Sequence, residues 1–112
     1  MASFGENAVH AWANINQNSS QSIVDSYNMS SLDDVATGRT RFNFSTAAIN
    51  NDFSYICVAG NRTGTTTSSR TQNNDESLTT TSCRIRNFQV GSGSTDVVSD
   101  ESFLSIIILS DN

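Results

Sequence analysis

Apolar and polar residues alternate through two short stretches of the chain, residues 11–16 (AWANIN) and 40–45 (TRFNFS). An alternation with a period of two places one set of side chains on the buried face of a β-strand and the other set toward solvent. Between the two stretches lies Gly38, which can supply the positive φ that a tight hairpin turn requires. The pattern therefore predicts antiparallel strands joined by short turns.

The rest of the chain continues this pattern, and no segment carries apolar residues at helical spacing over three turns. Residues 53–60 (FSYICVAG) have Tyr55 and Cys57 on one face and Ile56 and Val58 on the other. Apolar side chains on both faces favour a central strand, or one whose second face is covered by a partner subunit. We predict an all-β fold, a small antiparallel β-sandwich of about 7–8 short strands. The expected strands are residues 9–16, 21–27, 29–36, 39–46, 53–60, 83–90 and 102–109.

Four aromatic residues are the candidate anchors of the core. A tryptophan at an inward position of the first strand most often anchors a sandwich core, and a platform for stacking carbohydrate is the alternative. The candidate anchors are Trp12, Phe42, Phe44 and Tyr55.

Large apolar side chains are few for a chain of this length. Leu, Ile, Val and Phe contribute 25 of 112 residues, whereas Ser, Thr and Asn contribute 44. Residues 1–112 are thus expected to form a single domain with a thin core. Such a domain gains stability by burying further surface against copies of itself, so we expect a homo-oligomer.

Charge and hydropathy exclude several classes of partner. The chain has 11 carboxylates, six arginines that are scattered, and no lysine, for a formal net charge of −5. Binding to nucleic acid or to an anionic membrane surface requires clustered cations, so neither partner is expected. Residues 1–6 show neither the basic region nor the apolar region of a signal peptide, and the apolar run 103–109 is too short for a membrane helix. We expect a protein made in a cytosol, without membrane insertion.

The chain offers little to catalysis or to metal binding. His10 is the sole histidine, and no G-x-S-x-G motif occurs. Adjacent carboxylates such as Asp33 and Asp34 point to opposite faces of a strand and do not form a catalytic pair. Cys57 and Cys83 with one histidine cannot complete a zinc shell, so no metal and no cofactor is expected. The two cysteines are interpreted as small buried residues, and a disulfide remains open if their strands are neighbours.

A long polar segment, residues 61–82, has Leu78 as its one large apolar residue. It is expected to form a long polar loop at one end of the sandwich, or two thin edge strands joined by a loop. Loops of this length in compact domains are often functional, and amide and guanidinium groups suit a polar receptor; a solvated tip without a ligand is the alternative. The candidate binding residues are Arg62, Arg70, Gln72, Asn73 and Asn74.

Several runs of residues, in order and over nearly the whole chain, resemble a module of bacteriophage tail-fibre proteins. Residues 11–16 and 21–32 are similar to its A-W-V-N-F-x-G opening and its I-R-x-S-x-N-V-S-S-I stretch. Residues 37–47 resemble its G-x-Y-T-V-N-F-T-T-A run, residues 51–55 its D-A-N-Y element, and residues 103–108 its terminal V-x-V-x-V-F strand. The chain departs from the family at Ile15, where the family has Phe, and at Arg39, which replaces an acid.

The resemblance implies a β-rich appendage domain that is exposed on a virion, is commonly a homotrimer, and supplies no catalytic residues. It favours a non-enzymatic bacteriophage virion structural protein of tail-fibre type that binds a host surface or receptor. Expected partners are copies of the chain, other tail or capsid proteins, and a host surface glycan or protein; the protein would be assembled into virions in the host cytoplasm. Two alternatives stay open: a decoration or cement protein of the phage head, and a free-standing lectin-like module. Residues 1–8 are a candidate N-terminal arm for assembly.

Overall fold

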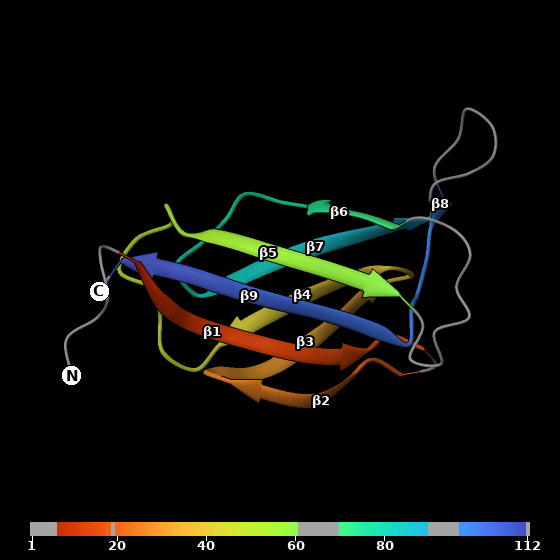
Figure 1. Cartoon of the computed structure of the whole chain (residues 1–112), viewed down its shortest axis with the longest axis horizontal. Coiled ribbons are helices and arrows are strands. Elements are labelled where there is room, and N and C mark those ends of the chain that lie inside the picture. The colour runs from red at the N-terminus through yellow and green to blue at the C-terminus, as the bar shows by residue number, and fades with distance from the viewer. Residues whose placement is uncertain (1–6, 19, 61–69, 90–96, 112) are drawn as a thin grey trace.

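The computed structural model describes residues 7–18, 20–60, 70–89 and 97–111. These residues form β-strands joined by turns and links (Figure 1). Of the candidate N-terminal arm, residues 1–6 lie outside the described residues, and residues 7 and 8 begin the first strand. In chain order the strands are β1 (Asn7–Asn16), β2 (Ser22–Tyr27), β3 (Met29–Ala36), β4 (Arg39–Phe44), β5 (Ser54–Gly60), β6 (Arg70–Asn74), β7 (Ser82–Gln89), β8 (Val97–Val98) and β9 (Phe103–Asp111).

The strands form two antiparallel sheets that pack face to face. Sheet A has the order β2-β1-β9-β5, and sheet B has the order β3-β4-β7-β6, with the two-residue β8 paired to β7. In Figure 1 the strands of sheet A lie in front of those of sheet B. The predicted antiparallel β-sandwich is confirmed, with eight strands in the two four-stranded sheets and β8 as a short addition.

The hairpin of β3 and β4 turns at Gly38, as the sequence predicted. Gly38 has a φ of 68°, and its NH donates to Asp100 Oδ1 at 2.6 Å, while its carbonyl accepts from the NH of Asn87 at 2.8 Å. A Cβ at this position would lie 2.5 Å from Val98 Cγ1 and 2.7 Å from Ser99 N. Both the backbone conformation and the close approach of Val98 of β8 and of Ser99 after it therefore require glycine.

The chain crosses from sheet A to sheet B at Asn28, between β2 and β3. Asn28 has a φ of 57°, a left-handed conformation that asparagine tolerates better than most residues. Its side chain holds the corner, because Oδ1 accepts from the NH of Thr46 at 2.8 Å and Nδ2 donates to the carbonyl of His10 at 3.0 Å. One residue thus links both sheets and the segment after β4.

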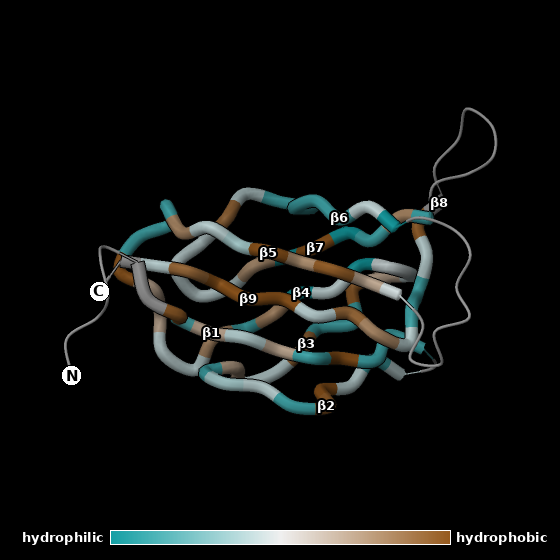
Figure 2. Tube along the Cα trace, viewed as in Figure 1, coloured by the Kyte–Doolittle hydropathy of each residue, from teal (hydrophilic) through white to brown (hydrophobic). Residues whose placement is uncertain are grey.

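The core is the layer of side chains between the two sheets, and it combines alanines and larger aliphatic residues with three phenylalanines. Sheet A contributes alanines of β1 and aliphatic residues of β1 and β9, and sheet B contributes residues of β4 and β7. Phe42 is fully buried and Phe44 nearly so, as predicted, and Tyr55 packs against the cluster from a partly buried position. Figure 2 shows the hydrophobic residues concentrated on β5 and β9 and hydrophilic residues along β6. The buried apolar residues are Ala11, Ala13, Ile15, Phe42, Phe44, Ala48, Phe53, Cys83, Ile85, Leu104, Ile106 and Ile108.

The prediction that Trp12 anchors this core is wrong. Its neighbours Ala11 and Ala13 are fully buried, so the alternation along β1 places Trp12 on the outer face of sheet A. Alternation separates two sets of residues but does not say which set faces inward. Here the small alanines of β1 face a core that Phe42 and Phe44 help to fill, and the indole remains outside.

The observed strand order decides two further expectations, the place of residues 53–60 in the sheet and the structure of residues 70–74. The strand expected at residues 53–60 is β5, and it lies at the edge of sheet A rather than in a central position. The central strands of that sheet are β1 and β9. Residues 70–74, expected within the long polar loop, form β6 and pair with β7, which matches the alternative of a thin edge strand.

A buried polar network closes one end of the sandwich. Gln17 and Glu101 exchange hydrogen bonds: Gln17 N donates to the carbonyl of Glu101 at 2.8 Å, and Glu101 N donates to Gln17 Oε1 at 3.1 Å. Gln17 Nε2 also donates to Thr40 Oγ1 at 3.1 Å, and Thr40 in turn contacts Gln21. Because these buried polar groups are paired with one another, they fix the relative position of the sheets without a large desolvation cost.

Candidate interaction surfaces

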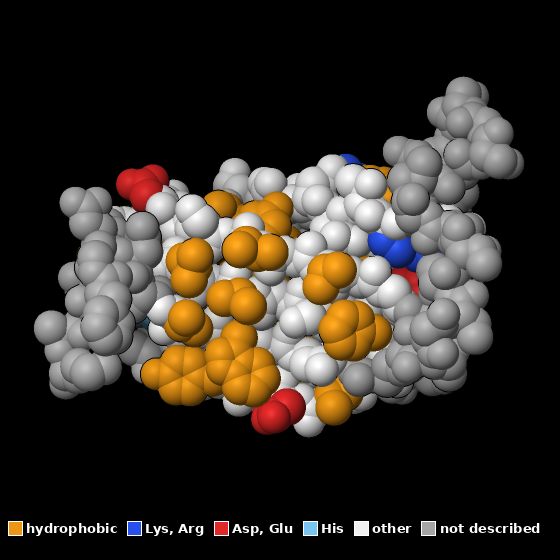
Figure 3. Space-filling view, viewed as in Figure 1, with side chains coloured by type: hydrophobic (Ala, Val, Ile, Leu, Met, Phe, Trp, Pro, Cys, Tyr) orange, Lys and Arg blue, Asp and Glu red, His pale blue; other side chains and the backbone are white. Residues whose placement is uncertain are grey.

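The outer face of sheet A exposes a group of large apolar side chains, which we call the apolar face. Six of the seven exposed large hydrophobic residues in the described part of the chain belong to strands of this sheet; the seventh, Ile49, lies in the link between β4 and β5. Figure 3 shows hydrophobic side chains gathered over this sheet. We define the apolar face as five of these six residues, Val9, Tyr27, Ile56, Val58 and Ile107, together with the partly buried Trp12; Val24, at the register shift of the edge strand β2, is left out of the definition.

Four residues of the apolar face form one continuous row across the sheet. Trp12 is paired in register with Tyr27 of β2 and with Ile107 of β9, and Ile107 is paired with Ile56 of β5. Side chains directly opposite each other on neighbouring strands are about 5 Å apart, so the row is contiguous. The exposed fractions are 56% for Tyr27, 40% for Ile107 and 63% for Ile56. A water-exposed apolar row of this kind is typical of a surface that contacts another protein.

This face carries almost no charge. Among the described side chains of β1, β2, β5 and β9, the one acidic or basic group other than His10 is Asp25, on the edge strand β2. The outward positions between the apolar residues are filled by neutral groups such as Asn14, Ser54 and Ser105. A partner on this face would therefore be recognised by shape and apolar contact rather than by ion pairs.

The outer face of sheet B has the opposite character, because it carries four of the six arginines. Arg39 and Arg41 of β4 lie opposite Arg86 and Arg84 of β7. The carboxylate of Asp75, 5% exposed, accepts from Arg84 Nε at 2.8 Å and lies 3.5 Å from Arg86 Nε and 3.8 Å from Arg39. The arginines are thus held around a shared buried carboxylate.

A second carboxylate completes the pairing on this face. Glu76 Oε1 accepts from Arg41 Nε at 3.0 Å, and Asp33 Oδ2 accepts from the same guanidinium at 3.2 Å. The hydrogen bond to Arg41 lowers the pKa of Glu76, and the hydrogen bonds to Glu76 and Asp33 raise the pKa of Arg41. These arginines neutralise carboxylates of the same molecule, so this face offers little free positive charge to an anionic ligand.

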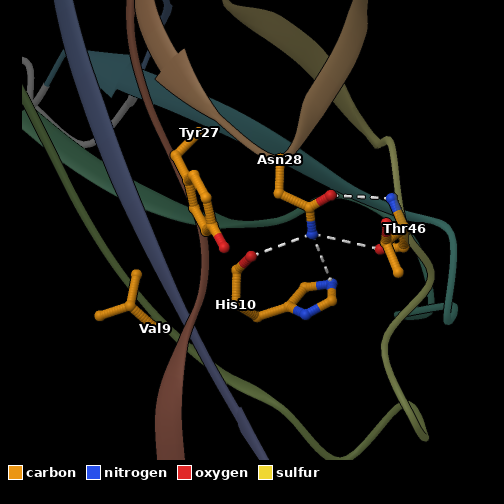
Figure 4. Close-up of a pocket in the computed structure, with 5 residues that line it drawn as sticks. All are labelled: Val9, His10, Tyr27, Asn28 and Thr46. Atoms are coloured by element: carbon orange, nitrogen blue, oxygen red, sulfur yellow. Dashed lines mark hydrogen bonds between the residues drawn. The ribbon is translucent and has the colours of Figure 1, made fainter. Parts of the chain in front are cut away.

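An open pocket of about 410 Å³ borders the apolar face where β2 turns into β3. Its walls are Val9, His10, Tyr27, Asn28 and Thr46 (Figure 4). The Asn28 amide lies between His10 and Thr46 and contacts His10 Nε2 at 3.2 Å and the carbonyl of Thr46 at 3.2 Å. The pocket has the volume of a small-molecule site, with an apolar wall of Val9 and Tyr27 and a polar wall fixed by the amide.

Sequence reasoning did not anticipate the pocket. Its residues come from β1, from the β2–β3 corner and from the segment after β4, so spacing along the chain does not bring them together. One signal was present: Asn28 interrupts two strand-like runs, and an asparagine at such a corner often adopts the left-handed conformation.

The structure does not gather the predicted binding residues at one surface. Arg62 lies outside the described residues. Arg70 is paired with the buried Glu101, and both side chains are almost fully covered. Gln72 and Asn74 are used within the fold: Gln72 Nε2 donates to Asn87 Oδ1 at 2.9 Å, and Asn74 Oδ1 accepts from the Tyr55 hydroxyl at 3.4 Å. Asn73 faces the other way, on the side of Arg86, and is exposed. Most of the predicted set therefore holds β6 in place.

The cysteines are free and face the interior from opposite sheets. Cys57 lies on β5 of sheet A, and Cys83 lies on β7 of sheet B. Burial raises the pKa of each thiol to about 12. Both thiols stay protonated near neutral pH, and a protonated thiol is a poor nucleophile.

Neither the remaining features of the structure nor comparisons with known proteins assign a function to the chain. The described residues contain no group of three or more His, Cys, Asp or Glu side chains placed to hold a metal ion. None of them forms a helix with the length and apolar character that crossing a membrane would take. The chain matches no family model, no curated protein and no solved structure.

Proposed function

We propose that this chain is a non-enzymatic structural protein of a bacteriophage virion, of tail-fibre type, that packs against neighbouring subunits and contacts the host surface. The observation that carries this proposal is the apolar face of sheet A. The resemblance of residues 11–16, 21–32, 37–47, 51–55 and 103–108 to a tail-fibre module supplies the class of protein.

The apolar face supports a role in assembly for an energetic reason. Transfer of apolar surface out of water is favourable by about 25 cal/mol per Å², so a contiguous row of exposed aromatic and aliphatic side chains favours a permanent neighbour. The core between the sheets is thin and uses alanine at two of its positions on β1. A subunit of this kind gains stability when the particle covers its second apolar layer.

The host contact is assigned to the part of the surface that stays exposed when the apolar face is covered. The candidate among the described residues is the exposed Asn73 on β6, and a contribution from Arg62 stays a prediction from the sequence. The pocket at Asn28 is not among the candidates, because Val9 and Tyr27 of its wall belong to the apolar face that a neighbouring subunit would cover.

A capsid decoration or cement protein is the second candidate, because the same apolar face would serve contact with capsid subunits. Reconstruction of particles from the virus that encodes the chain separates the two. Density for this sandwich on the tail supports the proposal, and density on the shell surface supports the decoration role. Absence of the chain from purified particles would overturn both and would favour a free-standing lectin-like module.

A further inference from the structure

We infer that the apolar face is the surface through which copies of this chain associate with one another. The inference deepens the assembly role and rests on the proposed function for its setting in a particle. It names the partner as a second copy of the chain and the contact as the row of Trp12, Tyr27, Ile56 and Ile107.

The size of the face fits a stable interface. The apolar face lies on the outer face of sheet A, which four strands of six to ten residues form. At about 4.8 Å between strands and about 3.4 Å per residue, the projected area is roughly 500 Å², and side-chain relief makes the accessible area larger. A standard interface takes about 800 Å² of accessible surface from each partner. The outer face of sheet A, with the apolar face at its centre, is therefore of the size that one side of such an interface uses.

The charge distribution favours a second copy over a partner of different chemistry. The chain has a formal net charge of −5, which opposes association of identical copies at long range. The acids concentrate elsewhere, however, and Asp25 is the one carboxylate among the described side chains of sheet A. Two apolar faces can stack without burying a like-charged pair at their centres. A partner chosen by charge would find nothing to pair with on this face.

The geometry of the contact would repeat the packing inside the subunit. Sheets pack face to face about 10 Å apart when alternate residues of both faces are apolar. The inner face of sheet A already packs in this way against sheet B. Its outer face presents Trp12, Ile107 and Ile56 at the same strand spacing, so copies of sheet A can stack on one another as sheets A and B do.

The test compares two isoleucines of nearly equal exposure. Ile56, 63% exposed, lies on the apolar face, and Ile49, 65% exposed, lies outside sheet A. The variants are Ile56→Glu, Ile56→Lys and the matched control Ile49→Glu. Use of both charge signs at position 56 separates the cost of burying a charge from the change in net charge. Circular dichroism and thermal unfolding show that each variant folds.

Sedimentation equilibrium and the emission of Trp12, the single tryptophan, are the two readouts. We expect the wild type and Ile49→Glu to exceed the 12.1 kDa monomer mass, with Trp12 emission shifting to longer wavelength on dilution. Both Ile56 variants should raise the dissociation constant at least ~100-fold and show the dissociated spectrum throughout. A wild type that is monomeric at all concentrations, or an oligomer that resists both Ile56 variants, overturns the inference.

The results of this solution test do not depend on whether, or where, the chain lies in a virus particle. An oligomer that depends on Ile56, from a chain absent from virions, would leave this inference standing and would refute the proposed function. A chain found in virions but monomeric in solution would refute this inference and leave the proposed function standing. Its apolar face would then contact another virion protein.

Discussion

Two adjacent isoleucines of β9 report on the two faces of sheet A. Ile106 is fully buried in the core, opposite Ala13 and Cys57, whereas Ile107 is 40% exposed on the apolar face, opposite Trp12 and Ile56. They share residue type, strand and backbone environment. Replacement of each by alanine therefore removes the same atoms and the same β-propensity. The difference between the two losses in the free energy of unfolding then reports on burial alone.

The expected magnitudes follow from what each side chain loses. Ile106→Ala deletes buried carbon atoms worth about 0.8 kcal/mol per methylene and leaves a cavity, so the free energy of unfolding should fall by about 3–4 kcal/mol. Ile107→Ala removes partly solvated atoms, and water fills the space, so the loss should be about 1 kcal/mol. The variants should thus differ by at least about 2 kcal/mol.

Urea unfolding followed by circular dichroism is the assay, at a protein concentration where the chain is dissociated. Ile106→Val is a milder companion variant, expected to cost about 1 kcal/mol if Ile106→Ala leaves too little folded protein to measure. Equal losses for Ile106→Ala and Ile107→Ala would refute the assignment of the core side of β9, and with it the definition of the apolar face.

Three further predictions concern the turn, the ion pairs and the thiols. Gly38→Ala should lower the free energy of unfolding by at least about 2 kcal/mol, because a Cβ there meets neighbouring atoms and φ is 68°; Gly60→Ala, where a Cβ meets nothing within 4 Å, should cost less than about 1 kcal/mol in thermal or urea unfolding. Asp75→Asn should cost about 1–3 kcal/mol by the same assay, since it removes the shared carboxylate of three arginines, and an unchanged midpoint would mean that the ion pairs contribute nothing. The pKa values of Cys57 and Cys83 are raised to about 12 from an ordinary 9.0. The free energy of unfolding therefore has its full value below pH 9 and falls as the pH rises toward 12. Between pH 7 and pH 10 the wild type should lose about 3 kcal/mol more than a variant with both cysteines replaced by alanine, and parallel pH profiles would contradict the buried thiols.

The strands were predictable because each is short and local in its pattern. Alternation located β1 and β4 within two residues of their ends, and Gly38 marked the hairpin between β3 and β4. The phase of the alternation does not follow from the sequence in the same way: residue type favours a buried tryptophan on β1, although the alanines beside it fill that role. When both faces of a sheet carry apolar residues, hydropathy cannot decide which face is inside.

The order of the strands and the candidate surfaces depend on contacts between distant residues. β5 has apolar residues on both faces, yet among the described strands it pairs only with β9 and lies at an edge. β6 is polar because Arg70 and Gln72 meet the polar partners Glu101 and Asn87, which lie 31 and 15 residues away. A sequence pattern records a residue's polarity but not its partner, so the sequence alone suggests a binding loop where the fold uses these residues internally.

The most direct test of a role in assembly is the chemical accessibility of the apolar face. Ile56→Cys and Ile49→Cys place reactive thiols on and off this face, while burial keeps the native Cys57 and Cys83 slow to react. Maleimide labelling is then timed for dissociated protein and for assembled protein. We predict that assembly slows the labelling of Ile56→Cys at least ~10-fold and leaves Ile49→Cys unchanged, as burial in an interface excludes the reagent. Equal labelling rates for Ile56→Cys in both states would contradict an assembly that covers this face.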